Sequence, residues 1–294
     1  MKPELRLIEL SVEIAAADAD QVNDVLLELQ DERWSLVEDV LVTKAWLVGI
    51  FESVSGANES WKRLSGYVEA SVIGNVDQRT LEAGDWQDSY KAHFHAWQFG
   101  SLHWVPVWQR DTFRLPPGHA VLWLDPGMAF GTGNHETTRL CVERLVENAS
   151  RAASPAKVID AGCGSGILAL SAAKLGFLNV VGFDNDPEAV RVSQENAAMN
   201  ELSRVEFFVA DLTTGLPKGS GDIVFANILA NVLQQFAQQL ADSVAPDGIL
   251  ILSGILAQEC ADVRACFSSI CPSWPQTSRT LGEWSDVVLR RPPR

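Results

Sequence analysis

The stretch Lys157-Val-Ile-Asp-Ala-Gly-Cys-Gly-Ser-Gly-Ile-Leu-Ala-Leu170 joins a β-branched run to three alternating glycines and then to an apolar run. Val158 and Ile159 suit a buried strand, because β-branched side chains pack well on a pleated sheet. The apolar run at 167–175 predicts a helix that closes at Gly176. A strand, a glycine turn and a helix in this order predict a nucleotide-binding crevice at the carboxyl end of a parallel sheet.

The spacing of Gly162, Gly164 and Gly166 bears on which ligand this crevice takes. Glycine has no Cβ, so the backbone at these positions can adopt positive φ and lie directly against a ligand. Dinucleotide-binding loops have the spacing G-x-G-x-x-G, whose third glycine brings the helix N-terminus toward a pyrophosphate. The shorter spacing here favours a ligand without phosphates, such as S-adenosylmethionine. Asp160 is then expected to hold the ammonium group of that ligand, directly or through water, while the close backbone accommodates its carboxylate.

The composition is that of an acidic globular protein, with 294 residues, a formal net charge of -15 and 47% hydrophobic residues. This length allows two domains and a sizeable core. Such acidity disfavours recognition of a phosphate backbone and favours a cationic partner, although many cytosolic enzymes are acidic for solubility alone.

Neither export nor membrane insertion is predicted. The first residues have no apolar core of a signal peptide, and the most apolar run, 248–257, is shorter than the roughly 20 residues that span a bilayer. Five cysteines without a C-x-x-C pair indicate neither a disulfide framework nor a zinc knuckle. We therefore expect a cytoplasmic protein.

Residues 1–76 are predicted to form a small α+β domain without chemistry of its own, since they contain no histidine, cysteine or glycine loop. Period-two and helical hydrophobic patterns alternate along this segment. They predict strands over 5–14, 34–42, 45–51 and 67–73 and helices over 18–30 and 56–64. The order β-α-β-β-α-β indicates a ferredoxin-like domain, a unit that commonly serves in recognition.

Residues 77–100 are predicted to be an interdomain connector, which leaves 101–294 for the nucleotide-binding domain. Aromatic residues crowd into this connector and just beyond it, at Trp86, Tyr90, Phe94, Trp97, Phe99, Trp104, Trp108 and Trp123. These side chains either form a wall around a substrate or are buried anchors that dock the connector onto the domain. Aromatic side chains bury a large apolar area, which favours the role of anchors.

All five histidines lie between positions 93 and 135, which invites a metal hypothesis. The segment has no H-E-x-x-H or other ligand spacing, so no metal site is predicted. The histidines concerned are His93, His95, His103, His119 and His135.

A second glycine-rich loop, at 124–138, directly precedes a helix predicted over 139–146. Its three glycines demand a tightly shaped backbone. Its place before the central strand predicts that it folds over the same ligand, the alternative being a simple turn.

The strands that follow the glycine loop end in polar residues. The strand over 180–184 ends in Asp184, about twenty residues after the glycines, where a ribose diol is held. Capping the helix that begins near Pro187 is its alternative role, although Asp186 is better placed for that cap. Asp211 follows the strand over 205–209 and is predicted to face the adenine edge.

Asn227 follows a strand over 222–226, and the remaining elements complete the sheet. They are a helix over 232–244, a strand over 248–252 and an antiparallel hairpin over 278–290. The predicted fold is a Rossmann-like, doubly wound, mostly parallel sheet with a final antiparallel hairpin.

Three motifs together closely resemble the PrmA family, the ribosomal protein L11 methyltransferases: 125–138, 160–166 and 226–230. Asp85-Trp86, Phe94, Glu283-Trp284 and 287–290 are similar to that family too, so the resemblance runs from about residue 80 onward. Before that point it lies in predicted topology. The sequence departs from the family at Asn134-His-Glu136, where many members carry Thr-His-Pro.

The resemblance implies a class I methyltransferase that methylates amino groups of a ribosomal protein and yields S-adenosylhomocysteine. It implies S-adenosylmethionine held by Thr138, Gly162, Asp184 and Asn227, and a mobile N-terminal domain that recognises the substrate. With the residues inferred from spacing, the expected cofactor-binding set is Thr138, Asp160, Gly162, Gly164, Asp184, Asp211 and Asn227.

Methyl transfer from a sulfonium needs an uncharged amine in line with the bond that breaks, and positioning supplies most of the acceleration. No dedicated general base is expected, because desolvation and the nearby positive charge both favour loss of the amine proton. Asn227 is expected to accept a hydrogen bond from the amine, with capping of the following helix as its alternative role.

Three other functions remain open at this stage. They are lysine methylation of another protein, methylation of an RNA or a small molecule, and ligand binding without catalysis.

Overall fold

A computed structural model describes residues 7–15, 18–19, 22, 25–26, 33–39, 44–68, 71–81, 96–124, 136–153 and 155–293. The chain divides into two compact units, Met1–His95 and Ala96–Arg294. Each unit has its own sheets and hydrophobic core.

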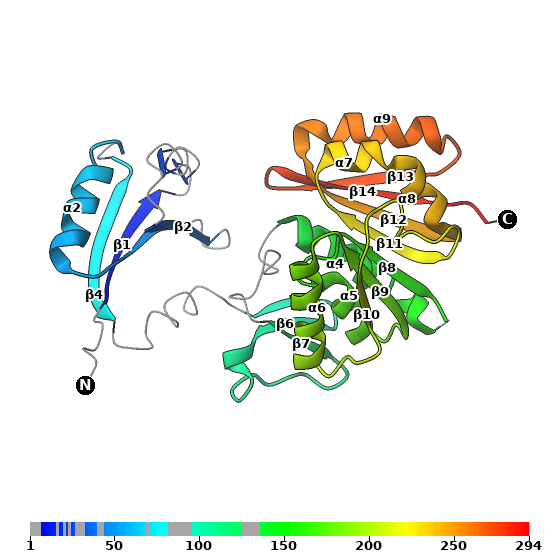
Figure 1. Ribbon diagram of the computed structural model, residues 1–294, viewed down its shortest axis with the longest axis horizontal. Coiled ribbons are helices and arrows are strands. Elements are labelled where there is room, and N and C mark those ends of the chain that lie inside the picture. Colours follow the sequence, from blue (N-terminus) through cyan, green and yellow to red (C-terminus); the bar gives the residue numbers. More distant parts are fainter. Residues whose placement is uncertain are drawn as a thin grey trace. The chain divides into compact units, whose positions relative to one another are not determined.

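The first unit contains a four-stranded antiparallel sheet in the order β2-β3-β1-β4. Figure 1 labels β1, β2 and β4 of this sheet. Its strands are β1 (Leu7–Ala15), β2 (Trp34–Asp39), β3 (Lys44–Phe51) and β4 (Ile73–Leu81), and its helix α2 is Val54–Leu64. Ala19 and Val22, in the helical segment between β1 and β2, share one core with Ala57 and Leu64 of α2. Both helical segments therefore pack on the same strands, which is the predicted ferredoxin-like arrangement.

The last strand of this sheet lies later than the sequence pattern predicted. The strand expected over 67–73 was wrong, because the turn after α2 continues through Tyr67, whose N–H donates to Leu64 O at 3.0 Å. β4 instead runs from Ile73 to Leu81 and carries residues 77–81, expected in the connector, into the sheet. There Arg79 makes two hydrogen bonds to the Glu9 carboxylate, at 2.7 and 2.9 Å. The rest of the expected connector up to residue 95 lies outside the described residues.

The second unit is built on a seven-stranded sheet in the order β10-β9-β8-β11-β12-β14-β13. Neighbouring strands are parallel from β10 to β12, whereas β14 is antiparallel to both β12 and β13. This confirms the doubly wound sheet with a final antiparallel hairpin. The strands are β8 (Lys157–Ala161), β9 (Asn179–Asp184), β10 (Glu206–Val209), β11 (Gly221–Asn227), β12 (Val244–Leu256), β13 (Gln276–Leu281) and β14 (Trp284–Arg290).

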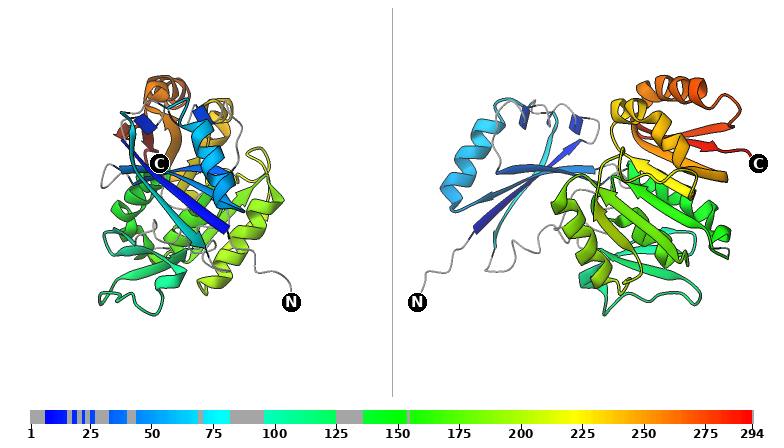
Figure 2. Two further views of the ribbon diagram at one scale, coloured as in Figure 1. Left: turned by 90° about the vertical axis from the view of Figure 1, so that its left-hand side faces the viewer. Right: turned by 45° about the vertical axis from the view of Figure 1, so that its right-hand side comes forward.

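Helices cover both faces of this sheet (Figure 2). One core cluster joins α4, α5 and α6 to the sheet, and the other joins α7, α8 and α9. The helix predicted over 232–244 is two helices, separated at Phe236, and α9 was not predicted. The bounds are α4 (Glu136–Glu147), α5 (Ile167–Lys174), α6 (Pro187–Met199), α7 (Ala230–Gln235), α8 (Ala237–Ser243) and α9 (Cys260–Ile270).

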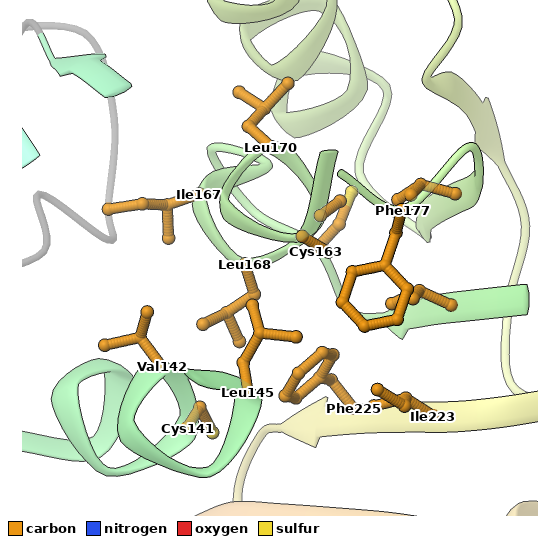
Figure 3. Packing of buried hydrophobic residues seen from close by; sticks show 14 of the residues in the cluster. Cys141, Val142, Leu145, Cys163, Ile167, Leu168, Leu170, Phe177, Ile223 and Phe225 are labelled. Carbon is orange, nitrogen blue, oxygen red and sulfur yellow. The ribbon is translucent and has the colours of Figure 1, made fainter. Parts of the chain in front are cut away.

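Cys141 and Leu145 of α4 pack with Leu168 of α5 and Phe225 of β11, in the core cluster between the sheet and helices α4, α5 and α6 (Figure 3). Strands covered on both faces read as continuous apolar runs, as in residues 249–252 of β12, which are all fully buried. The glycine loop after β8 is therefore flanked by a strand and a helix that are both packed into this core.

A buried ion pair fixes α4 to the sheet. Arg144 of α4 donates two hydrogen bonds to the carboxylate of Asp286 in β14, at 2.6 and 2.9 Å, and both side chains are buried. Removing one partner of such a pair typically costs about 3–5 kcal/mol, because it leaves a buried charge alone.

A three-stranded sheet precedes α4 and was not predicted. It consists of β5 (Trp97–Phe99), β6 (Leu102–Pro106) and β7 (Ala120–Leu124). Trp104 is buried, donates its indole N–H to Ser171 Oγ of α5 at 2.9 Å and packs edge-on against Phe99. Phe99 and Trp104 are thus anchors, as expected. Trp86, Tyr90 and Phe94 lie outside the described residues.

Candidate active site

Several predicted site residues meet at the carboxyl edge of the parallel strands. Gly162 follows β8, Asp184 ends β9 and Asn227 ends β11. β8 lies between β9 and β11, which is the switch point where doubly wound sheets bind ligands. A cavity of about 430 Å³ opens there, lined by Gly162, Phe183, Asp184, Asn185, Ala210, Asp211, Leu212, Ile228, Leu229, Val232 and Phe236.

The glycine loop adopts the backbone that its spacing predicted. Gly162, Gly164 and Gly166 have φ values of +76°, +52° and +79°. A Cβ on Gly162 would lie 2.6 Å from Cγ2 of Ile228. Any larger residue at 162 would therefore disturb the turn after β11 as well as the loop itself.

Asp184 joins the glycine loop to the cavity. Its Oδ2 accepts a hydrogen bond from Gly164 N at 2.9 Å, and its Oδ1 accepts one from Asp186 N at 3.1 Å. Asp186, rather than Asp184, caps α6, because its side chain accepts from Glu188 N at 2.9 Å. Each oxygen of Asp184 has a further lone pair that can accept from a hydroxyl.

Asp160 lies behind the loop rather than along the cavity. Its side chain is 1% exposed, and its Oδ2 accepts a hydrogen bond from Ala169 N in the first turn of α5 at 3.1 Å. Burial raises the pKa of this carboxyl to about 7, and the nearby charge of Asp184 adds to the rise. In this structure, its contacts are with the start of α5.

Asp211 also lines the cavity, just after the end of β10, which is the neighbour of the strand that ends in Asp184. Its Oδ1 accepts hydrogen bonds from the backbone and hydroxyl groups of Thr213 and Thr214. These bonds lower the pKa of Asp211 to about 2, so the group is ionised at neutral pH.

Asn227 and Thr138 form a pair beside the cavity. Asn227 donates its Nδ2 hydrogen to Thr138 Oγ1 at 3.4 Å, and Thr138 is buried near the start of α4. The helix after β11 is capped at Leu229 without a side-chain bond, so the helix-capping role considered for Asn227 is wrong. Of the expected set, Thr138, Asp160, Gly164 and Asn227 do not line the cavity; the loop at 125–135 before Thr138 lies outside the described residues.

The apolar wall of the cavity was missed by sequence reasoning. Phe183, Leu212, Ile228, Leu229, Val232 and Phe236 belong to it. Leu229, directly after the Asn227 turn, is 65% exposed. Hydrophobic periodicity does not separate such residues from core residues, because the same apolar face continues from the core into the cavity.

The described histidines do not gather around a metal site. His103 Nε2 and His119 Nδ1 lie 2.7 Å apart, and burial lowers the pKa of His103. Within the described ranges, no group of three or more His, Cys, Asp or Glu side chains is arranged to hold a metal ion. His93, His95 and His135 are outside those ranges. All five cysteines are free thiols.

None of the helices described by the structure has both the length and the apolar character needed to cross a membrane.

Comparisons with known proteins place this site in a family. A family model described as ribosomal protein L11 methyltransferase (PrmA) matches residues 7–292. The ribosomal protein L11 methyltransferase of Geotalea daltonii is 36% identical over 323 residues, covering 97% of this chain and 98% of that protein. That of Trichlorobacter lovleyi is 45% identical over 241 residues, covering 78% of this chain and 74% of that protein.

A solved structure agrees with these matches. The ribosomal protein L11 methylase of Lactobacillus delbrueckii subsp. bulgaricus is 31% identical with a TM-score of 0.59, covering 68% of this chain and 100% of that one. The family model begins at residue 7, so it includes the first unit, where the sequence resemblance lay in topology alone. The chain therefore belongs to the ribosomal protein L11 methyltransferase (PrmA) family.

Proposed function

We propose that this protein is a cytoplasmic enzyme that transfers methyl groups from S-adenosylmethionine to lysine or N-terminal amino groups of ribosomal protein L11. The observation that carries the proposal is the family match over residues 7–292 together with a cavity at the switch point of the sheet. The family match supports the type of reaction, and the cavity is the position that we assign to the cofactor.

The cavity fits S-adenosylmethionine in size and chemistry. Its volume of about 430 Å³ is in the range of small-molecule sites, which are mostly apolar with a few placed polar groups. Gly162 lines the cavity with its backbone alone, and Asp184 offers two carboxylate oxygens to a ribose diol. When bound, the cofactor supplies a methyl group activated by a sulfonium. Gly164 and Asp160 support this site from behind, through Asp184 and the start of α5 respectively.

Asn227 is the residue that we assign to the acceptor amine. Because its Nδ2 donates to Thr138, Oδ1 is the atom that can accept a hydrogen bond from an amine N–H. That bond orients the nitrogen lone pair without removing a proton. Thr138 holds the amide plane, and a dedicated general base is not required.

The acidity of the chain supports a basic protein as substrate. A net charge of -15 attracts a cationic partner and opposes binding through a phosphate backbone. We assign recognition of that protein, free or on the ribosome, to the first unit, which has a ferredoxin-like sheet and a core of its own. Direct recognition of nucleic acid or membrane is not part of the proposal.

The test uses the full chain, radiolabelled S-adenosylmethionine, purified ribosomal protein L11 and intact large subunits. We expect label on L11 amino groups, located by mass spectrometry of proteolytic fragments. Label on ribosomal RNA or on a different protein would replace the proposal by one of the other methyltransferase functions. Cofactor binding without transfer to any ribosomal component would leave only a ligand-binding protein.

A further inference from the structure

Strand β12 contains a bulge next to the Asn227 turn. Leu252 pairs with Val287 and Ile255 pairs with Ser285, so Ser253 and Gly254 together oppose Asp286 alone. Gly254 has a φ of +77°, in the left-handed region that favours glycine. Bulges of this kind re-aim the chain and occur often beside active sites.

Gly254 packs directly against the backbone that follows Asn227. A Cβ on Gly254 would lie 2.4 Å from the carbonyl oxygen of Ile228 and 3.0 Å from its nitrogen. Ile228 N also donates a hydrogen bond to Ser253 O at 3.2 Å. The turn after β11 is thus held at a distance that only glycine permits.

Ser253 bonds to the residue that directly precedes Thr138, the hydrogen-bond partner of Asn227. Its hydroxyl donates to Thr137 O at 3.1 Å, in the first turn of α4, and the side chain is fully buried. Thr138, the next residue, accepts the hydrogen bond from Asn227. Two consecutive residues of β12 therefore hold the segments that carry both ends of the Asn227–Thr138 bond.

We propose that Ser253 and Gly254 are positioning residues for methyl transfer, which set the Asn227 amide by fixing the turn behind it and the helix start beside it. This inference rests on the proposed function. Reacting groups must be held within a fraction of an ångström, and a misplacement of about 1 Å can cost on the order of 100-fold in rate. The bulge touches the turn and the helix rather than the substrate, so its effect is exerted through Asn227.

Gly254→Ala tests the close contact, and Gly118→Ala is its matched control. Gly118 has the same φ of +77°, but nothing lies within 4 Å of the position that its Cβ would take. Both variants carry the backbone penalty of a positive φ, and only Gly254→Ala pushes the turn. We expect kcat for labelled methyl transfer to L11 to fall roughly 10- to 100-fold in Gly254→Ala, with the larger part of the effect in kcat rather than KM, and to stay at the wild-type value in Gly118→Ala.

Ser253→Ala keeps the test informative if Gly254→Ala does not fold, as judged by circular dichroism, because it removes a hydrogen bond and adds no atom. The decisive measurement is a double-mutant cycle with Asn227→Ala. If the bulge acts through Asn227, Gly254→Ala or Ser253→Ala should lower kcat much less in the Asn227→Ala background than in the wild type. Equal fold losses in both backgrounds would overturn the positioning role.

The outcomes separate this inference from the proposed function. Failure of the wild type to methylate L11 would refute the proposed function itself. An active wild type with an impaired Asn227→Ala variant, but with wild-type kcat in folded Gly254→Ala and Ser253→Ala, would refute the positioning role alone. An unimpaired Asn227→Ala variant would refute the assignment of Asn227, and the bulge would lose its role with it.

Discussion

At the scale of single residues, Asp184 has two tasks, since it accepts from Gly164 N and lines the cavity. We predict that Asp184→Ala weakens S-adenosylmethionine binding by at least roughly 100-fold, because each of the two hydrogen bonds to this charged group contributes about 1.5–3 kcal/mol. Asp186→Ala is the control: it removes the cap of α6, at a cost of about 1 kcal/mol in stability, and should retain cofactor affinity. Calorimetry measures both. A folded Asp184→Ala variant with wild-type affinity would remove Asp184 from the site.

Asn227 is tested separately, because its proposed partner is the amine rather than the cofactor. We predict that Asn227→Ala lowers kcat far more than it weakens cofactor binding, since the lost interaction is needed in the transition state. Asn227→Asp places a carboxylate beside the amine, which pairs with a cationic lysine and keeps it protonated. Its rate should therefore recover at alkaline pH more than the wild-type rate rises. Parallel pH profiles, with the chemical step rate-limiting, would show that Asn227 does not touch the amine.

Residues at strand ends could be predicted from the sequence because local pattern alone places them. Gly162 follows one recognisable strand and Asp184 ends the next, and both line the cavity. The contact between Gly162 and Ile228, 66 positions apart, could not be foreseen, since it depends on the packing of two turns. The same holds for Asp160, whose burial depends on helix α5 closing over it.

At the scale of elements, the titration of Asp160, which bonds to the start of α5, makes the stability of the folded chain depend on pH. The pKa of its carboxyl is about 7 in the folded chain, against about 3.9 in an unfolded one. Between those values the folded state holds a proton that the unfolded state has released, so this group makes stability fall as pH rises. Asp160→Asn keeps an acceptor for Ala169 N–H and does not titrate. We predict that its melting temperature, relative to wild type, rises from pH 5 to pH 8 without cofactor. Melting curves that shift equally with pH in both proteins would contradict the pKa assignment.

Elements with clear periodicity were predictable, and those without it were not. The strands around the glycine loop read as apolar runs, whereas β4 is exposed from Gly74 to Thr80 and shows no alternation in burial. β5 to β7 have only three to five residues each, too few for a period to be distinguished from a loop. The break between α7 and α8 at Phe236 could not be predicted, because the sequence there contains no glycine or proline.

At the scale of the whole molecule, the division at His95 and Ala96 defines a fragment. All residues of the two core clusters around the seven-stranded sheet lie after this boundary, so a fragment beginning at Ala96 retains its own core. We predict that it binds S-adenosylmethionine like the full chain and fails to methylate L11. Calorimetry and label transfer measure the two properties. Full activity of the fragment on L11 would show that the first unit does not recognise the substrate. A fragment cut at residue 77 is the poorer choice, because it keeps residues 77–81 of β4 without their sheet.

The ion pair between Arg144 and Asp286 ties α4 to the final strand of the second unit, across 142 positions. A ribosome translating this chain makes α4 early and β14 after every other strand of the sheet. Until β14 emerges, the Arg144 side chain lacks its buried counter-charge. Contacts of such sequence separation form late, because the loop between them must first be closed. During synthesis, therefore, the charge of Arg144 stays uncompensated until the last strand of the sheet has been made, and the α4 end of the sheet is the part whose packing is completed last.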